Sequence, residues 1–210
     1  MTRVLLADDH ALVREGIRRL LNSVETIEVV GEAKDGLDAV EKIKELRPDV
    51  ALIDVSMPKK DGIEVTAEVA SLQIATRVLI LSMYKNKPFV QRTLRAGATG
   101  FVWKGAATDT LIEAINEVHH GRRVVPNDFE GEGFDPKSLD ADEPSRGLSK
   151  REFQVLCYLA SGMTNRDVAE DLGISVKTVD THRGHLLKKL SLRNNADLAR
   201  FAIRNGYVEP

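Results

Sequence analysis

Short apolar runs alternate with amphipathic segments along the first 120 residues of the chain. Runs of consecutive apolar residues predict five strands, at Val4–Ala7, Ile27–Val30, Val50–Ile53, Val78–Leu81 and Phe101–Trp103. Between them, apolar residues recur at helical spacing, as in Ala11–Leu21, Leu37–Leu46, Pro88–Ala96 and Thr110–Val118. Strands that are apolar at consecutive positions must be covered on both faces. The pattern therefore predicts a doubly wound α/β domain with a five-stranded parallel sheet.

The apolar periodicity stops after this region. Residues 121–146 are rich in Gly, Pro, Asp and Glu, which is the composition of a linker. A stretch of this length without its own structure is unusual inside a compact domain. We therefore predict a first domain over residues 1–120, an acidic flexible linker over 121–146 and a second domain over 147–210.

Residues typical of helix N-caps mark where the helices of the second domain begin. Ser149, Thr164 and Ser175 stand where helix N-caps belong, and Glu152 has the spacing of a capping box with Ser149. The second helix is short, the third is long, and a turn containing Gly173 joins them, which is a helix-turn-helix pattern. With a fourth helix from about Asn195 to Arg204, the prediction is a small all-α domain of four helices.

Composition is typical of a folded, globular protein, with 42% hydrophobic and 30% charged residues. Cys157 is the only cysteine, which excludes an intrachain disulfide and favours a reducing compartment. Without a signal-peptide pattern or an apolar run of membrane-spanning length, we expect a cytoplasmic protein that binds no membrane. The net charge is −2, yet the second domain has ten Lys and Arg against seven Asp and Glu. That basic end is the candidate for a polyanionic partner such as DNA.

Polar residues follow four of the predicted strands: Asp8 and Asp9 the first, Asp54 the third, Ser82 the fourth and Lys104 the fifth. In an open parallel sheet, ligands bind at the carboxyl ends of strands, so these side chains should converge. Crowded carboxylates repel unless a cation lies among them, and an all-oxygen site suits Mg²⁺. Lys104 and the Ser82 hydroxyl can hold phosphoryl oxygens, and a carboxylate can attack phosphorus. Asp54 is the expected acceptor.

Each residue also has a simpler interpretation. Asp9 is placed to cap the helix that begins near His10, Lys104 can be a solvated loop lysine, and Ser82 can be an ordinary strand-end hydroxyl. The phosphoryl site is favoured because the strand ends together supply the residue types that one reaction needs.

Two other functions compete with a phosphorylated regulator. A phosphatase or hydrolase of the haloacid dehalogenase type needs a second aspartate two residues after the nucleophile, and Ser56 occupies that position. A binding module that dimerises without phosphorylation would not need Asp9, Asp54 and Lys104 together.

The segments LLADDH, LIDVSMPKKDG, LILSMY and GATGFVWKG resemble the receiver domain of bacterial two-component response regulators over residues 1 to about 120. The resemblance implies a flavodoxin-like fold and phosphorylation of Asp54 by a sensor histidine kinase or phosphotransfer protein. It implies a Mg²⁺ site formed by Asp8, Asp9, Asp54 and the backbone carbonyl of Ser56. It also implies that Ser82 and Phe101 are a switch pair, in which the ring turns inward after phosphorylation.

The segment LSKREFQVLCYLASGMTNRDVAEDLGISVKTVDTHRGHLLKKL resembles the LuxR-type output domain of the NarL/FixJ response regulators, from about Gly147 to Gly206. In its long helix, an apolar face (Val176, Val179, Leu186 and Leu190) should pack inward. The opposite face would lie in the major groove of promoter DNA. The resemblance implies base contacts from Lys177, Thr178, Asp180, Thr181 and Gly184, and phosphate contacts from Lys188 and Lys189.

The fourth helix has Leu198, Phe201 and Ala202 on one side. These residues can complete the domain core, but the resemblance suggests that part of this helix pairs two output domains on DNA. A homodimer would read two half-sites in inverted orientation. The expected protein is a response regulator in which phosphorylation controls dimerisation and DNA binding. It is not an enzyme, beyond slow self-phosphorylation and self-dephosphorylation at Asp54.

Overall fold

The computed structural model describes the whole chain except residues 84–86, 127–146, 206 and 209–210, together with the side chains of residues 87–89 and 150. Two compact units are formed, one holding a sheet and the other holding the four C-terminal helices. Each unit is described by itself. In the described part of the chain, no helix combines the length and the apolar character needed to span a membrane.

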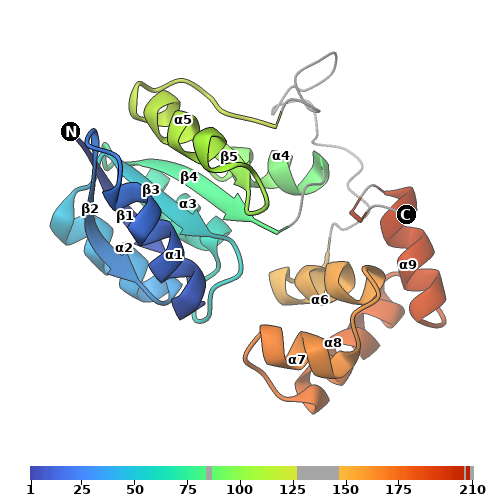
Figure 1. The fold of residues 1–210 in the computed structure, drawn as a ribbon. Coiled ribbons are helices and arrows are strands. Elements are labelled where there is room, and N and C mark those ends of the chain that lie inside the picture. Colours follow the sequence, from blue (N-terminus) through green and yellow to red (C-terminus); the bar gives the residue numbers. More distant parts are fainter. Residues whose placement is uncertain (84–86, 127–146, 206, 209–210) are drawn as a thin grey trace. The chain divides into compact units, whose positions relative to one another are not determined.

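The first unit is built on a parallel sheet with the order β2-β1-β3-β4-β5 (Figure 1). Its strands are β1 (Thr2–Ala7), β2 (Ile27–Ala33), β3 (Val50–Asp54), β4 (Arg77–Ser82) and β5 (Gly100–Trp103). All five lie where the apolar runs predict them. The central strand β3 is buried along its whole length, as expected for a sheet covered on both faces.

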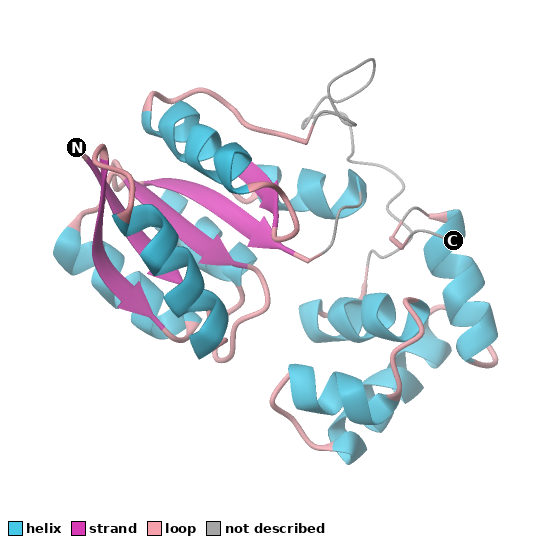
Figure 2. Ribbon diagram, viewed as in Figure 1, coloured by secondary structure: helices cyan, strands magenta, loops and turns pink. Residues whose placement is uncertain are grey.

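Helices cover both faces of this sheet (Figure 2). On one face lie α1 (Ala11–Asn22) and α5 (Thr108–His119), whose buried Leu21 and Ile115 join a core with alternate residues of the strands. On the other face lie α2 (Gly36–Leu46), α3 (Gly62–Ser71) and α4 (Lys87–Arg95). The predicted helices do not include α3, which is rich in β-branched residues and depends on a capping box between Asp61 and Glu64. The doubly wound α/β fold is confirmed.

A short segment after α5 lies along the outer edge of β5. The Phe101 amide donates to the Val124 carbonyl (2.9 Å), and the Val124 amide donates to the Thr99 carbonyl (3.2 Å). Gly100 and Val124 form a parallel bridge. The start of the predicted linker is therefore attached to the sheet unit through the backbone of Val124. The rest of the predicted linker, residues 127–146, lies outside the described residues.

The second unit contains α6 (Lys150–Ala160), α7 (Asn165–Asp171), α8 (Val176–Lys189) and α9 (Asn195–Arg204). Ser149 and Thr164 form capping boxes at α6 and α7, and Ser175 caps α8 through the Thr178 amide. The helix-turn-helix of α7 and α8 and the fourth helix are thus confirmed.

The core of this unit is formed by side chains from all four helices. Among them are Phe153, Leu156, Val168, Val179, Leu186 and Leu198, with Tyr207 after the last helix. Val176 is an exception to the predicted inward face of α8, because 43% of it is exposed. It is the first residue of the helix, where fewer neighbouring residues cover a side chain.

Candidate metal centre and nucleic-acid interface

The carboxylates predicted to converge do lie together at the carboxyl edge of the sheet. β1 and β3 are neighbours, with Ala7 beside Ile53, so the residues that follow them meet. One ligand atom each from Asp8, Asp9, His10 and Asp54 lies within 4.8 Å of the others. Asp8 and Asp54 are buried, whereas 21% of the Asp9 side chain is exposed. We call this largely buried group of carboxylates the acidic pocket.

Lys104 reaches this pocket from the end of β5. Its Nζ lies 2.9 Å from Asp8 Oδ2 and 3.0 Å from Asp54 Oδ1, and only 11% of its side chain is exposed. Its backbone amide donates to the Ser82 carbonyl, which fixes the lysine at the strand end. Burial opposes its charge, but Asp54 and Asp8 outweigh this and raise the pKa of Lys104. Lys104 is therefore a buried, charged partner of the acids, and the solvated-lysine interpretation is wrong.

The capping interpretation of Asp9 is also wrong. The N-cap of α1 is His10, which makes no side-chain capping bond, and it is Asp8 Oδ1 that accepts the His10 amide at 2.8 Å. Asp9 instead has its carboxylate 2.8 Å from His10 Nδ1. His10 was not predicted as part of this cluster, although its position directly after two aspartates is a signal that could have identified it.

The electrostatics of the cluster leave negative charge uncompensated. Burial raises the pKa of Asp54 to about 6, with help from Asp8 and Asp9 and against the pull of Lys104. Burial, with Asp8 nearby, also raises the pKa of Asp9 although His10 opposes the shift. Asp54 Oδ2 is buried and has no hydrogen-bond partner among the described residues. One lysine cannot neutralise three carboxylates, and these oxygens fit a hard divalent cation such as Mg²⁺.

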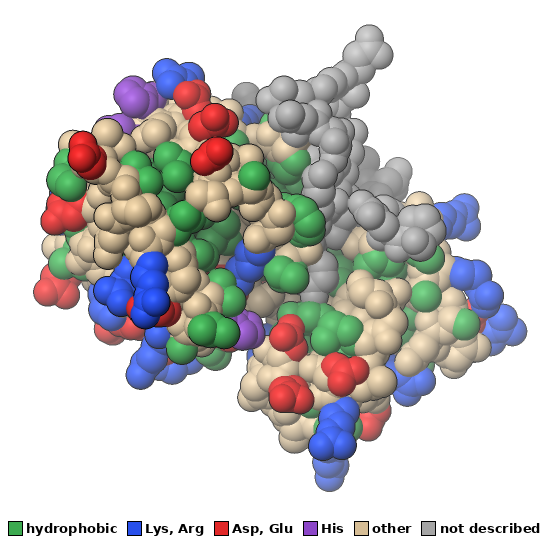
Figure 3. Space-filling view, in the orientation of Figure 1, with side chains coloured by type: hydrophobic (Ala, Val, Ile, Leu, Met, Phe, Trp, Pro, Cys, Tyr) green, Lys and Arg blue, Asp and Glu red, His purple; other side chains and the backbone are tan. Residues whose placement is uncertain are grey.

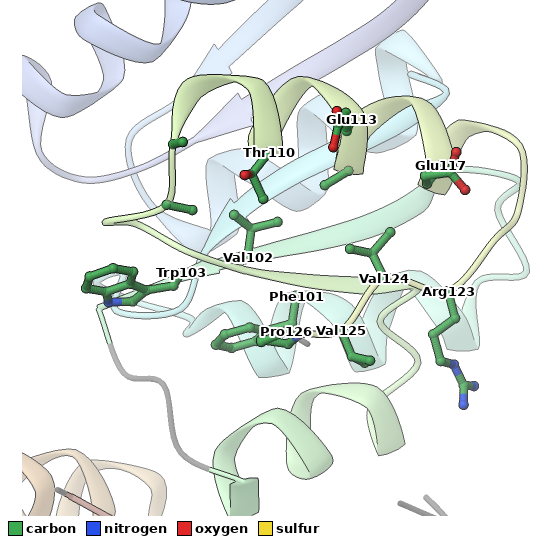
Figure 4. A pocket seen from close by; sticks show the side chains of 13 residues that line it. Phe101, Val102, Trp103, Thr110, Glu113, Glu117, Arg123, Val124, Val125 and Pro126 are labelled. Atoms are coloured by element: carbon green, nitrogen blue, oxygen red, sulfur yellow. The ribbon is translucent and has the colours of Figure 1, made fainter. Parts of the chain in front are cut away.

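Three further predicted residues lie on or directly after the strands β3, β4 and β5. Ser56 lies in the loop after β3, and no hydrogen bond between described residues ends on its carbonyl. Ser82 is buried at the end of β4, beside β3. Phe101 is also buried, so this structure has its ring already inside, next to Pro126 (Figure 4). The switch movement of Ser82 and Phe101 stays a prediction.

A groove of about 520 Å³ runs between α5, β5 and the Val124 segment. Figure 4 shows Thr110, Glu113 and Glu117 of α5 on one side and Phe101, Val125 and Pro126 on the other. None of Asp8, Asp9 and Asp54 lines it. The groove is therefore separate from the acidic pocket. The clustered charges of the acidic pocket make it the candidate functional site.

In the second unit, the predicted DNA-reading side of α8 is largely open. Lys177, Thr181, Gly184 and Lys188 are exposed, opposite the buried Val179 and Leu186. A Cβ at Gly184 would meet no atom within 4 Å. In the view of Figure 3, Lys and Arg side chains of this unit also gather over α9.

The Thr181 hydroxyl donates to the Lys177 carbonyl within α8 at 2.9 Å, and two other predicted base-contacting residues have partners outside this helix. The Thr178 hydroxyl lies 2.7 Å from that of Ser175, at the N-cap of α8. Asp180 Oδ1 accepts a hydrogen bond of 2.5 Å from Asn165 of α7. These contacts orient α8 against its neighbours, and DNA contacts by the two side chains stay predictions.

Lys189 and the predicted dimer residues contact other parts of the second unit. Lys189 Nζ lies 2.7 Å from Glu152 Oε2 and 3.0 Å from the Gly147 carbonyl, so it ties the end of α8 to the start of α6. Leu198 and Ala202 are fully buried, as expected if α9 completes the core. Phe201 is half-buried and its ring centroid lies 6.0 Å from that of Tyr207. The exposed large apolar residue of α9 is Ile203.

Comparison with known proteins matches both units. A model of the response regulator receiver domain matches residues 4–116, and a model of the luxR family of bacterial regulatory proteins matches residues 146–202. The oxygen regulatory protein NreC of Staphylococcus epidermidis is 35% identical over 99% of this chain and 99% of its own length. NreC of Staphylococcus carnosus is 36% identical with the same coverage.

Solved structures agree with these matches. The signal receiver domain of the response regulator NarL from Mycobacterium tuberculosis is 42% identical, with a TM-score of 0.57, and covers 58% of this chain and 98% of its own. The response regulator ChrA of a heme-sensing two-component system is 33% identical, with a TM-score of 0.54, over 99% of this chain and 98% of its own.

Response regulators of this kind interact with kinases and with DNA, and many dimerise. The similarity to NreC extends over the whole chain. The chain therefore belongs to the LuxR-type response regulators, which regulate transcription under the control of phosphorylation.

Proposed function

We propose that Asp54 is the phosphoacceptor of this response regulator and takes its phosphoryl group from the phosphohistidine of a sensor histidine kinase or a phosphotransfer protein. A bond forms between an Asp54 carboxylate oxygen and phosphorus, the phosphorus–nitrogen bond breaks, and the imidazole leaves. The observation that supports this most strongly is the buried Asp54 carboxylate: its Oδ1 pairs with Lys104 Nζ at 3.0 Å, while its Oδ2 has no hydrogen-bond partner among the described residues. Phosphoryl transfer depends mainly on positioning and charge neutralisation, and this pocket is built for both.

Asp8, Asp9, Asp54 and the Ser56 carbonyl would hold Mg²⁺ in this pocket. When bound, Mg²⁺ neutralises charge on the carboxylates and on the phosphoryl oxygens. His10 holds the Asp9 carboxylate from outside, with Nδ1 2.8 Å from Oδ1. Lys104, which bridges Asp8 and Asp54 in this structure, would pair with a phosphoryl oxygen, and the Ser82 hydroxyl would donate to another.

The same residues would permit slow self-phosphorylation by a small phosphodonor and slow hydrolysis of the acyl phosphate. We place this chemistry in the cytoplasm, where the proposed kinase and promoter DNA are both present.

The test of Asp54 combines intact-mass measurement with DNA retention. After incubation with Mg²⁺ and acetyl phosphate, wild type should gain the mass of one phosphoryl group, and Asp54→Ala should gain none. Asp49→Asn is the matched control, because Asp49 precedes the same strand at its opposite end. An unchanged mass in wild type, or equal labelling of Asp54→Ala, would contradict the assignment.

We also propose that α8 reads promoter DNA through Lys177, Thr181, Gly184 and Lys188, which its exposure supports. Lys177 and Lys188 make no ion pair with another described residue, so their charges are available to phosphates or guanine. Thr178 and Asp180 would contribute at the edge of this face. A homodimer, promoted by phosphorylation, would place two such helices on inverted half-sites.

Replacing Lys177 and Thr181 by alanine tests the reading face. Affinity for a selected DNA site should fall, and the preference over random DNA should shrink, because both side chains face the groove in the proposal. Arg204→Ala removes an exposed charge from α9 and serves as the control. Unchanged affinity and selectivity in the α8 variant would refute the assignment.

A further inference from the structure

The loop between β3 and α3 carries the Ser56 carbonyl, and its two ends are fixed by backbone contacts. The Val55 amide donates to Leu81 of β4 (3.1 Å), and the Gly62 amide donates back to the Val55 carbonyl (2.9 Å). A Cβ on Gly62 would lie 2.4 Å from the Asp54 carbonyl oxygen, so only glycine permits this close return of the chain. These contacts hold the loop where it leaves and rejoins the core.

The middle of the loop is held from a different element, the start of α2. Lys59 Nζ lies 2.6 Å from Asp35 Oδ2, and the Gly36 amide donates to the Pro58 carbonyl at 3.3 Å. A Cβ on Gly36 would lie 2.0 Å from the Lys60 carbonyl oxygen, so the backbones of α2 and the loop touch at this point. Lys59 itself has a positive φ of 66°, a conformation that a non-glycine residue keeps only when surrounding contacts impose it.

Asp35 is well suited to anchor this lysine. It is the N-cap of α2, where its Oδ1 accepts the amides of Leu37 and Asp38 at 3.1 and 3.0 Å. Its other oxygen, Oδ2, is left for Lys59. Only 4% of the Asp35 side chain is exposed, against 56% of that of Lys59, so a rigid buried carboxylate holds a mobile exposed ammonium. Both carboxylate oxygens are used, which fixes the direction of the ion pair.

From these contacts we propose that Asp35 and Lys59 are positioning residues for the metal site, because their ion pair holds the loop that carries the Ser56 carbonyl, one of the proposed ligands. Neither residue touches the metal or the phosphoryl group. The inference rests on the proposed Mg²⁺ site and deepens it: metal affinity is set partly by a clamp between α2 and the loop. Partners of this kind commonly tune a metal site through its ligands.

The chain offers a control for the charge of the lysine. Lys60 is the next residue of the same loop, but it pairs with Glu68 of α3 and not with α2. Removing either lysine takes one positive charge from the loop, which by itself should strengthen the binding of a divalent cation. Loss of positioning acts in the opposite direction. The sign of the change therefore separates the two effects.

The experiment is calorimetric titration of the full chain with MgCl₂ alone, at fixed pH and ionic strength. Lys59→Met and Asp35→Asn should each weaken Mg²⁺ binding, by roughly tenfold as for other partners of metal ligands. Asn can still cap α2 through its oxygen, so Asp35→Asn tests the ion pair more than the helix. The double variant should bind Mg²⁺ with about the same affinity as the single variant that binds it less tightly, because both substitutions remove the same ion pair. Lys60→Met should bind as tightly as wild type or more tightly.

Two results would overturn the inference, and they are distinguishable. If wild type binds Mg²⁺ and Lys59→Met binds as tightly as Lys60→Met, the clamp has no role while the metal site stands. If wild type itself does not bind Mg²⁺, the proposed site fails, and the inference fails with it. Thermal unfolding of each variant without metal checks that a weaker site does not reflect a partly unfolded domain.

Discussion

At the scale of single residues, the acidic pocket combines charges that oppose its own stability. Asp54 is 2% exposed, and burial raises its pKa to about 6, so its ionised form is unfavourable in the folded protein despite Lys104. A carboxyl group whose pKa is raised by folding binds its proton more tightly in the folded protein than in the unfolded protein. Its contribution to stability is therefore present at low pH and is lost as the pH rises from about 4 toward 6.

Asp54→Asn should therefore stabilise the metal-free protein above pH 6, where wild type has lost this contribution. The expected gain in the free energy of unfolding is about 3 kcal/mol, the energy that corresponds to a pKa raised from 3.8 to about 6. Urea unfolding at pH 7 and pH 4.5, without Mg²⁺, measures it, and the gain should shrink at the lower pH. A variant less stable than wild type at pH 7 would show that the Lys104 pairing outweighs the burial of charge.

Lys104→Met should have the opposite effect. Two buried carboxylates, Asp8 and Asp54, would lose the ammonium that lies within 3.0 Å of each. The free energy of unfolding at pH 7 should fall by about 3 kcal/mol, as for other buried pairs that lose one partner. The loss should become smaller toward pH 5, because Asp54 can then be protonated. Equal losses at both pH values would contradict this explanation.

At the scale of elements, two adjacent lysines of α8 have different surroundings. Lys188 is exposed, while Lys189 holds Glu152 of α6 at 2.7 Å. Burial alone would raise the pKa of Glu152, but hydrogen bonds from Lys189 and Ser149 outweigh it and lower that pKa. This contribution is present above the unfolded pKa near 4.5 and is lost as the pH falls below it.

The two lysines should therefore separate stability from DNA binding. Lys189→Met should lower the thermal midpoint of the protein at pH 7, because it leaves the largely buried Glu152 without its cation. Lys188→Met should leave the midpoint unchanged, but reduce the slope of log affinity against log salt by about one, as for one lost phosphate contact. Melting curves and salt titrations of the two variants provide the measurement. The reverse assignment of effects would show that Lys189 is the phosphate contact.

Local signals explain why most elements could be predicted. The N-cap residues Ser149, Thr164 and Ser175 accept hydrogen bonds from amides three residues further on. Runs of consecutive apolar residues predict buried strands directly. The convergence of Asp8, Asp54 and Lys104 followed from sheet topology alone. Partners that depend on distant packing were beyond such signals. Lys189 meets Glu152 across 37 residues, and nothing local marks Lys59 as the partner of Asp35.

At the scale of the whole molecule, a receiver and an output domain are joined by one tether, and the first part of that tether is bonded to the sheet. Phe101, the predicted switch residue, donates its own amide to Val124. The strand that presents Lys104 to the acidic pocket is thus also the strand that holds the beginning of the tether. Linker composition concealed this, because the short segment after Gly121 has too few residues to show an alternating pattern.

Cutting the chain should reveal the contribution of this contact. A receiver that ends at His120 should unfold at lower urea than one that ends at Pro126, because the amide of Phe101 loses its acceptor and the apolar edge loses its cover. Urea unfolding of the two fragments tests this, with a fragment ending at Val124 as an intermediate. Equal midpoints for all three would mean that residues 121–126 add nothing to the sheet.

The same pairing covers one edge of the sheet. β5 is the last strand of the sheet, and an uncovered edge strand offers its amides and carbonyls to any other strand that approaches. Val124 occupies that edge with residues of the same chain. The segment that begins the tether should therefore also limit edge-to-edge aggregation, and solubility of the receiver should depend on residues that composition alone would assign to a spacer.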